Sequence, residues 1–434
     1  MIQGVGDKYV VPQWLPFRVA ALHRESSTFH RPVSTIDYGP AHSAFREALD
    51  DFRNTPSVFL GTELMGVADV IGLKEDAREL AEYVLTEEIS GRVAQEQART
   101  ILGKVNLPHL EEKAAVRAYK VRLAQYPRDA IAWVEQARFY TALGQRRKAR
   151  RSILAALHLS PSERFVVRAA IRYFIHYEEW DEAFRVATKA YAANPDPLIY
   201  GPLLSVASYL EKLPSKSKVV AEAALSSTDP FVFSEALEAF GTLEVLNGSD
   251  QRARKFFRKA WIDPTRPVIG HSQWILRDKI PGLALDRKFD FSESREAMSW
   301  LRFSFLDFEG ALAGSIGWAL EESYSRSPYV LGATAACHAE KFDVAIEVAR
   351  RGLLSNPKDE TLLNNLAFAY LRNGNVAKAR NCFDSIKHKA DRDEEIAPAA
   401  TFGLLLMAEG EFTRGARYYS MAIDRAVKNG DLRT

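Results

Sequence analysis

The sequence is poor in cysteine and nearly neutral, and each shortage excludes a class of protein. Its 434 residues include two cysteines, Cys337 and Cys382, which are too few for a disulfide framework and wrongly spaced for a zinc knuckle. This usage fits a reducing compartment, so we expect a cytoplasmic protein. The formal net charge is +2, so any attraction to nucleic acid must come from a local basic patch.

Membrane segments and catalytic motifs are missing too. No stretch approaches the roughly 20 apolar residues that span a bilayer, and the N-terminus lacks the charged start and apolar run of a signal peptide. There is no phosphate-binding glycine loop, and no two of the nine histidines have the i, i+4 spacing of a helical metal site. We therefore expect no membrane association, no enzyme activity, no metal site and no cofactor.

What the sequence does contain is a repeat. Hydrophobic residues make up 47% of the chain and charged residues 26%, as in soluble folded proteins. Particular residue types recur at a step of 34 residues. The recurring sets are Pro127, Pro161 and Pro195; Ala149 and Ala183; Ala156 and Ala190; and Pro230 and Pro264.

Each recurring residue has a mechanical role in a pair of helices. In the unit that starts at residue 130, an aromatic residue on the first helix, Tyr140, fills the space between the helices. Gly144 ends that helix, because a residue without Cβ tolerates a left-handed turn. Ala149 sits at the helix crossing, where a larger side chain would push the pair apart. Tyr370, Gly374 and Ala379 repeat the same spacing later in the chain.

This pattern resembles the tetratricopeptide-repeat (TPR) family over about 115–264 and 326–428. The resemblance implies an all-α fold, a right-handed superhelical solenoid of helix-turn-helix repeats. One such hairpin cannot bury its own apolar face, so neighbouring units must stack.

The remaining segments divide the chain further. Four prolines and three aromatic residues near the N-terminus predict an extended arm, which either packs along the solenoid or is a flexible tail. Pro267, Gly270, Pro281 and Gly282 predict an irregular insert near 265–295. The expected organisation is an extended arm at 1–45, a helical, degenerate repeat at 46–110, a TPR solenoid at 111–264, a divergent insert and helical pair at 265–325, and a C-terminal TPR array at 326–434.

The resemblance also implies where a partner protein binds. In the TPR family the first helices line a concave groove, and the matching positions here are Arg138, Phe165, Arg168, Arg172, Asn364 and Phe368. Three arginines with apolar neighbours suit an acidic or extended segment, or a C-terminal carboxylate, through charge-assisted hydrogen bonds. A solvated charged face is the plainer interpretation. We expect one or more protein partners, and the oligomeric state stays open.

Two basic runs lie on expected second helices, which form the outer face. They comprise Arg146, Arg147, Arg150 and Arg151, and Arg252, Arg254 and Lys255. They are either a solvated face or a nucleic-acid site. A helical-repeat protein that reads nucleic acid would carry the same residue type at the same position of every unit. The fifth residue of the units varies instead between Val134, Arg168, Pro202 and Asn364. A protein-binding scaffold or regulatory adaptor is therefore the leading hypothesis, and a nucleic-acid-binding regulator is the alternative.

Overall fold

The computed structural model describes residues 9–17, 39–71, 73–87, 94–95, 98, 101–102, 111–214, 217–279, 291, 294–386 and 396–428. Within these ranges every regular element is a helix, which confirms the all-α prediction. The chain forms two compact units. Unit 1 comprises Met1–Thr28 and Glu112–Thr434, and unit 2 comprises Phe29–Glu111.

Unit 2 is built on three helices, α2 (Gly39–Asn54), α3 (Val58–Ile71) and α4 (Lys74–Thr86). Its core contains Leu49, Met65 and Leu80. The ring of Phe52 meets that of Tyr83 edge-on at 4.9 Å, which fixes α2 against α4. Because α2 begins at Gly39, the helical part of the chain starts inside the segment predicted to be an extended arm.

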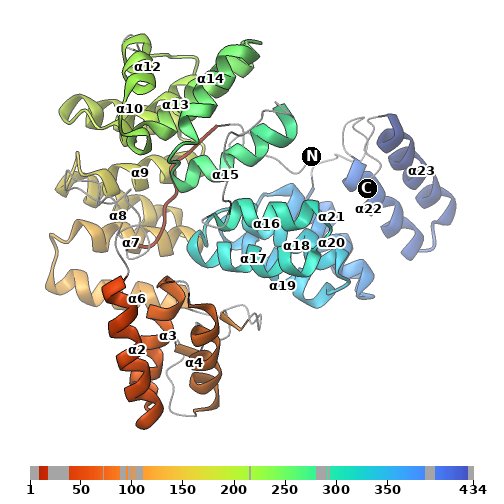
Figure 1. The fold of residues 1–434 in the computed structure, drawn as a ribbon. Helices are drawn as coiled ribbons and strands as arrows, with labels where there is room; N and C mark the ends of the chain where they lie inside the picture. Colours follow the sequence, from red (N-terminus) through yellow and green to blue (C-terminus); the bar gives the residue numbers. More distant parts are fainter. Residues whose placement is uncertain are drawn as a thin grey trace. The chain divides into compact units, whose positions relative to one another are not determined.

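Unit 1 consists of helices that pack largely in successive antiparallel pairs (Figure 1). The earlier helices are α6 (Glu111–Gln125), α7 (Ala130–Ala142), α8 (Arg146–Leu159), α9 (Arg164–His176), α10 (Trp180–Ala193), α11 (Pro197–Tyr209), α12 (Ser217–Ser226), α13 (Pro230–Leu246) and α14 (Asp250–Ala260). The later helices are α15 (Arg266–Trp274), α16 (Arg295–Ser304), α17 (Phe308–Glu321), α18 (Ser327–His338), α19 (Phe342–Ser355), α20 (Glu360–Arg372), α21 (Val376–Asp384), α22 (Ile396–Ala408) and α23 (Phe412–Lys428).

The turns and crossings of these pairs follow the repeat signature. Gly144 and Gly374 have φ of 67° and 75°, so each ends a first helix in the left-handed conformation predicted for it. Ala149 and Ala379 are fully buried where the helices cross. Each first helix also needs a cap for its amide groups, and Asp359 supplies one by accepting a hydrogen bond from the Leu362 N–H at 2.9 Å.

The segment predicted to be irregular, 265–295, is helical over much of its described part. α15 runs to Trp274 and continues as a π-helical turn over Ile275–Lys279. Pro267 is tolerated because it lies in the first turn of α15, where its missing N–H has no helical partner to lose. Gly270 permits close packing, since a Cβ there would meet Glu296 Oε2 at 2.6 Å. Proline and glycine at this place are therefore compatible with a helix, and residues 280–290 lie outside the described ranges.

Early and late repeats of unit 1 contact each other directly. Arg351 on α19 forms an ion pair with Glu112 on α6. A Cβ added to Gly144, at the α7–α8 turn, would lie 2.2 Å from the backbone oxygen of Leu354 on α19. In a simple solenoid each repeat touches only its neighbours. Here contacts also join repeats that are about 200 residues apart in the sequence, so unit 1 is held by long-range packing as well.

Gly144 and Gly374 provide a matched test of that contact. Both have positive φ, so alanine at either position costs about 1–2 kcal/mol of backbone strain. Nothing lies within 4 Å of a Cβ at Gly374, whereas Gly144→Ala must also displace the α19 backbone. We expect Gly144→Ala to lower the free energy of unfolding by roughly 1–3 kcal/mol more than Gly374→Ala does, as measured by urea unfolding. Equal losses would show that the α7–α8 turn does not touch α19.

Candidate functional site

An extended segment, residues 9–17, lies along the first helices of unit 1; we call it the arm (Figure 1, red). The Trp14 side chain is 1% exposed, and its ring lies 6.2 Å from that of Tyr173 on α9. On its other side the Tyr324 ring lies 5.1 Å away. The Trp14 backbone N–H donates a hydrogen bond to the Tyr324 hydroxyl at 3.2 Å. Residues 9–17 of the predicted arm therefore pack along the solenoid, whereas residues 39–45 belong to α2 of unit 2.

Phe17 fixes the second end of the arm on α7 and α9. Its backbone N–H donates to Glu135 Oε1 at 2.9 Å, and its ring meets the Phe165 ring edge-on at 5.1 Å. Glu135 is itself held by Arg138, whose Nη2 lies 2.8 Å from Glu135 Oε2. Two of the residues predicted to contact a partner, Arg138 and Phe165, are thus engaged around the arm. Their contact with another protein stays a prediction.

Arg168, also predicted to contact a partner, is buried in an ion pair. Its two terminal nitrogens donate to the two carboxylate oxygens of Glu235 on α13, each at 2.8 Å. The Thr265 hydroxyl donates to Glu235 at 3.0 Å, and Arg168 also donates to the Leu198 carbonyl. Both charged side chains are at most 4% exposed. This network joins α9, α11 and α13, so Arg168 has a structural role in addition to the binding role predicted for it.

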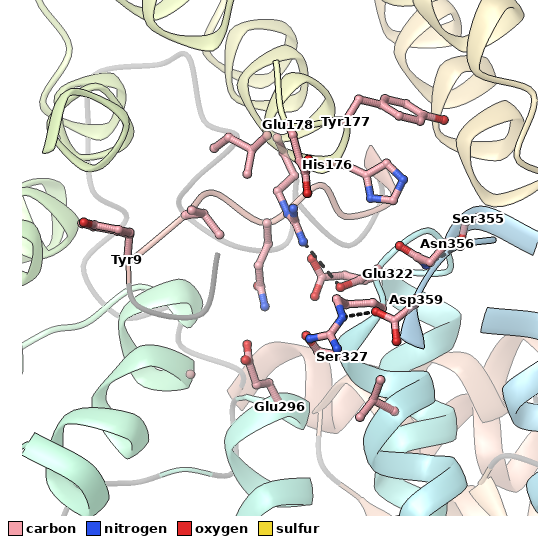
Figure 2. Close-up of a pocket in the computed structure, with 18 of the residues that line it drawn as sticks. Tyr9, His176, Tyr177, Glu178, Glu296, Glu322, Ser327, Ser355, Asn356 and Asp359 are labelled. Carbon is pink, nitrogen blue, oxygen red and sulfur yellow. Dashed lines mark hydrogen bonds and ion pairs between the residues drawn. The ribbon is translucent and has the colours of Figure 1, made fainter. Parts of the chain in front are cut away.

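A cavity of about 990 Å³ opens beside the arm (Figure 2). It is bordered by the arm, the ends of α9 and α10, one face of α15 and α16, and the turns before α18 and α20. Figure 2 shows Glu178, Glu296, Glu322 and Asp359 around this opening, each from a different part of unit 1. Four of the seven tryptophans line it, namely Trp180, Trp274, Trp300 and Trp318. The wall therefore combines aromatic side chains, most of them buried, with charged groups.

The charges of the cavity are balanced. Its lining includes four cationic side chains (Arg146, Arg172, Arg326 and Lys358) and five carboxylates (Glu178, Glu296, Glu322, Asp359 and Glu360). Several of these groups already have partners in the wall. Arg326 pairs with Asp359 at 2.5 Å, and the guanidinium of Arg172, a predicted contact residue, lies over the Tyr324 ring at 5.2 Å and donates to Ser325. A cavity of this kind does not favour a ligand of one strong charge.

Buried polar groups without hydrogen-bond partners gather at the edge formed by the arm and α9. They are Gln13 Oε1, Trp14 Nε1 and His176 Nε2, considering the part of the chain that the structure describes. Gln13 and His176 line the cavity. Buried polar atoms without a partner are rare in folded proteins, which distinguishes this edge from the ion-paired part of the wall.

His176 is neutral in this environment. Burial lowers the pKa of its imidazole to about 3, and the positive charge of Arg172 acts in the same direction. The ring packs edge-on against Tyr177 and Tyr324, with centroids 4.6 and 5.6 Å away. The packing of the ring and the positive charge of Arg172 therefore both favour the neutral imidazole.

The other predicted contact residues lie apart from the cavity. Asn364 and Phe368 are on α20; Asn364 is buried and Phe368 is half-buried, and neither belongs to the lining. The structure thus brings Arg138, Phe165 and Arg172 near the arm and leaves Asn364 and Phe368 elsewhere. The lining residues Glu322, Arg326 and Asp359 did not emerge from the sequence, because they sit in turns outside the repeat pattern. The tryptophans of the 265–325 segment were the sequence feature that could have indicated the cavity wall.

The two basic runs differ in how far their charges are paired. On α8, Arg146 and Arg150 both pair with Glu179, whereas Arg147 and Arg151 are exposed. On α14, a nitrogen of Arg252 lies 3.8 Å from Glu244 Oε2, Lys255 is exposed, and Arg254 is half-buried. Carboxylates of the same unit thus pair with part of each run, and nucleic-acid binding there stays a prediction.

Comparison with known proteins identifies the repeat. Residues 337–401 match the family model for the tetratricopeptide repeat. The chain contains tetratricopeptide repeats. The matched TPR segment spans α19, α20 and α21, where Ala345, Gly374 and Ala379 occupy the signature positions. No curated protein matches the sequence.

The TPR architecture is also similar to that of solved structures. One is the APC/C hetero-tetramer Cut9–Hcn1, at 12% identity over 88% of this chain and 81% of that one, with a TM-score of 0.35. Another is yeast Tom70, at 14% identity over 91% and 90%, with a TM-score of 0.30. The TPR domain of P58(IPK) matches at 13% identity over 87% and 99%, with a TM-score of 0.27. These values are too low to transfer a partner or an activity to this chain.

Among the described residues, no three or more His, Cys, Asp or Glu side chains are grouped so as to hold a metal ion. Within the same residues, no helix combines the length and the apolar character that crossing a bilayer requires.

The buried pair of Arg168 and Glu235 predicts a large loss of stability when one partner is removed. Arg168→Met leaves a buried carboxylate without its cation, so we expect a loss of about 3–5 kcal/mol in the free energy of unfolding. The control is Lys212→Met. Its partner Asp181 is exposed, and breaking this pair should cost less than about 1 kcal/mol. Similar losses in urea unfolding of the two variants would contradict a buried role for Arg168.

The neutral His176 predicts a dependence of stability on pH. The unfolded imidazole takes up a proton near pH 6.5, whereas the folded one does so only near pH 3. Between these values the unfolded state binds more protons, so stability falls as the pH is lowered, by at most about 1.4 kcal/mol per pH unit. His176→Gln should remove this part of the pH dependence in urea unfolding between pH 7 and 4.5. His158→Gln, at an exposed site on α8, is the matched control for the loss of an imidazole elsewhere in unit 1.

Proposed function

We propose that this TPR protein is a non-catalytic scaffold or regulatory adaptor that holds an extended segment of a partner protein in the cavity beside its arm. The observation that carries the proposal is the arm itself. It is an extended chain lying on first helices, and it is bound through side-chain packing and through backbone N–H groups of Trp14 and Phe17. A surface that accepts one extended segment has the chemistry to accept another next to it.

The cavity beside the arm fits a segment of mixed character. Among its tryptophans, the half-buried Trp300 on α16 gives the wall apolar surface for a large side chain of the partner. Its balanced charges, together with the internal pairing of Arg138 and Arg168, favour a segment that is extended and near neutral over one that is strongly acidic. The expected partner is thus a protein segment bound mainly by its backbone and by one or two large side chains.

The state of the two cysteines and of the cavity carboxylates supports a binding role over catalysis. Burial raises the pKa of Cys337 to about 12 and also raises that of Cys382, so neither thiol is activated as a nucleophile. Both cysteines are free, which suits a reducing compartment such as the cytoplasm. Two carboxylates of the cavity wall are engaged in structural hydrogen bonds: Glu322 with Trp318 and Tyr324, and Asp359 with Arg326 and the Leu362 N–H.

Site-specific photo-crosslinking in the native host tests the proposal. A benzoylphenylalanine at Lys358 or Thr361 places the reactive group in the cavity wall, and one at Val219, which is exposed on α12, serves as the control. We expect a protein adduct from the two cavity positions that survives nuclease treatment and is absent from the control. Mass spectrometry should map the crosslink to an extended segment of the partner.

Two outcomes would count against the cavity. Equal labelling at Val219 would mean that the captured protein binds the control surface on α12 as well as it binds the cavity. The second outcome is an adduct that is lost on nuclease treatment and that forms instead when the reactive group is at Arg151 or Lys255. This result would favour the nucleic-acid alternative, because those positions belong to the exposed parts of the basic runs.

A further inference from the structure

The turns that join first and second helices in unit 1 share a feature of the backbone. In eight of these turns one residue has a positive φ, considering the part of the chain that the structure describes. These residues are Gly144, Glu178, Glu211, Gly248, Leu306, Glu340, Gly374 and Gly410. Glycine adopts this conformation freely, whereas a side chain makes it unfavourable. A glutamate at such a place strains the backbone, so its side chain is a candidate for a role outside the fold.

Two of these glutamates, Glu178 and Glu211, belong to neighbouring turns at the Tyr9 end of the cavity. The turns are joined by the rings of Trp180 and Tyr209, which stack at 3.8 Å, and the Tyr9 ring meets that of Tyr209 edge-on at 6.2 Å. Figure 2 shows Tyr9 and Glu178 on the cavity wall. Burial raises the pKa of the Tyr9 phenol, and Tyr209 and the negative charge of Glu211 raise it further. Glu211 therefore acts on the same end of the cavity, although it is not part of the lining.

The carboxylates around these two turns differ in whether a cation compensates their charge. The paired ones are Glu179 with Arg146 and Arg150, Asp181 with Lys212, and Glu182 with Arg185. Glu178 and Glu211 are exposed, and neither forms an ion pair with a residue in the described ranges. The two glutamates in the left-handed conformation are thus the ones whose negative charge is left uncompensated.

The cavity as a whole stays near neutral because its unpaired charges are separated. Lys358, on the turn before α20, is also exposed and also has no ion pair with a described residue. The unpaired carboxylate of Glu178 comes from the turn before α10 instead. A segment without net charge therefore fits this cavity best if its basic residue lies at the Tyr9 end.

Carboxylates next to tyrosine rings suit a long cationic side chain. Its charged end can pair with the carboxylates, while its apolar stem packs along the half-buried rings of Tyr9 and Tyr209. We propose that the partner segment carries a lysine or arginine that pairs with Glu178 and Glu211 beside the Tyr9 ring. This inference rests on the proposed function, because it names a residue of the segment that the cavity is proposed to hold.

The test is a selection of peptides on the full chain. The probe is a phage-displayed library of random nine-residue peptides, and the selected peptides are then synthesised with a fluorescent label for anisotropy measurements. Peptides that bind in the cavity are recognised with the variant Thr361→Trp. Thr361 lines the cavity, so the larger side chain should obstruct it and weaken the binding of such peptides at least tenfold.

We expect most cavity-binding peptides to contain a lysine or arginine whose replacement by glutamine weakens binding at least fivefold, with a smaller effect at high salt. In the double variant Glu178→Gln and Glu211→Gln, the same replacement should weaken binding less than twofold, because no carboxylate is left to pair. Glu340→Gln is the matched control. Glu340 is exposed and has a φ of 57°, as Glu211 does, but it does not line the cavity, so the fivefold loss should remain.

Glycine variants separate recognition from a role in the fold. Glu178→Gly and Glu211→Gly relieve the left-handed strain, so neither should lower the midpoint of urea unfolding. Both variants together should nevertheless remove the preference for a basic residue. A lowered midpoint would contradict the proposal, because the carboxylates would then serve the fold.

Two further results would overturn the inference while leaving the proposed function intact. The first is a set of cavity-binding peptides that lack a basic residue. The second is a basic residue whose replacement weakens binding as much in the Glu178→Gln and Glu211→Gln variant as in the unmodified chain. Failure to select any peptide that Thr361→Trp weakens would contradict the proposed function itself, and the inference with it.

Discussion

The packing of Trp14 against Tyr173 and Tyr324 connects the arm to the early and the late repeats of unit 1. Tyr173 belongs to an early repeat and Tyr324 precedes a late one, so a single buried indole joins the arm to both parts of the unit. Truncating a buried tryptophan typically costs about 3–5 kcal/mol. The Tyr324 hydroxyl accepts from the Trp14 N–H and donates to Glu322, which in turn accepts from the Trp318 indole. The cavity wall is thus built outward from this one contact.

The helices were predictable because their signals are local. Gly144 and Gly374 indicate left-handed turns, and Ala149 and Ala379 indicate places where two helices cross closely. Each signal lies within one 34-residue unit. At 265–295 the sequence predicted an irregular insert, because proline and glycine, here Pro267 and Gly270, commonly interrupt helices. In the fold one stands in a first turn and the other permits close packing against Glu296. A residue type alone does not reveal which of these roles it has.

The site was harder to predict because its contacts are not local. The sequence placed Arg138 and Arg168 on first helices, and both are there. The partner of Arg138, Glu135, is local, three residues earlier on the same helix. The partner of Arg168, Glu235, could not be recognised, since it is 67 residues away and occupies no signature position. The period of the repeat describes how each unit meets the next one. It carries no information about the arm or about contacts between early and late repeats, and these are the elements that enclose the cavity.

The sequence separation of Trp14 and Tyr324 also affects how the chain folds during its synthesis. These two hydrogen-bonded residues are 310 positions apart. At a translation rate of about 5–20 residues per second, roughly 15–60 s separate the appearance of Trp14 from that of Tyr324. During this interval the nascent chain carries an aromatic segment that has no complete binding place, while the early repeats already fold beside it. The newly made protein is therefore exposed to aggregation, and to capture by chaperones, until its late repeats emerge from the ribosome.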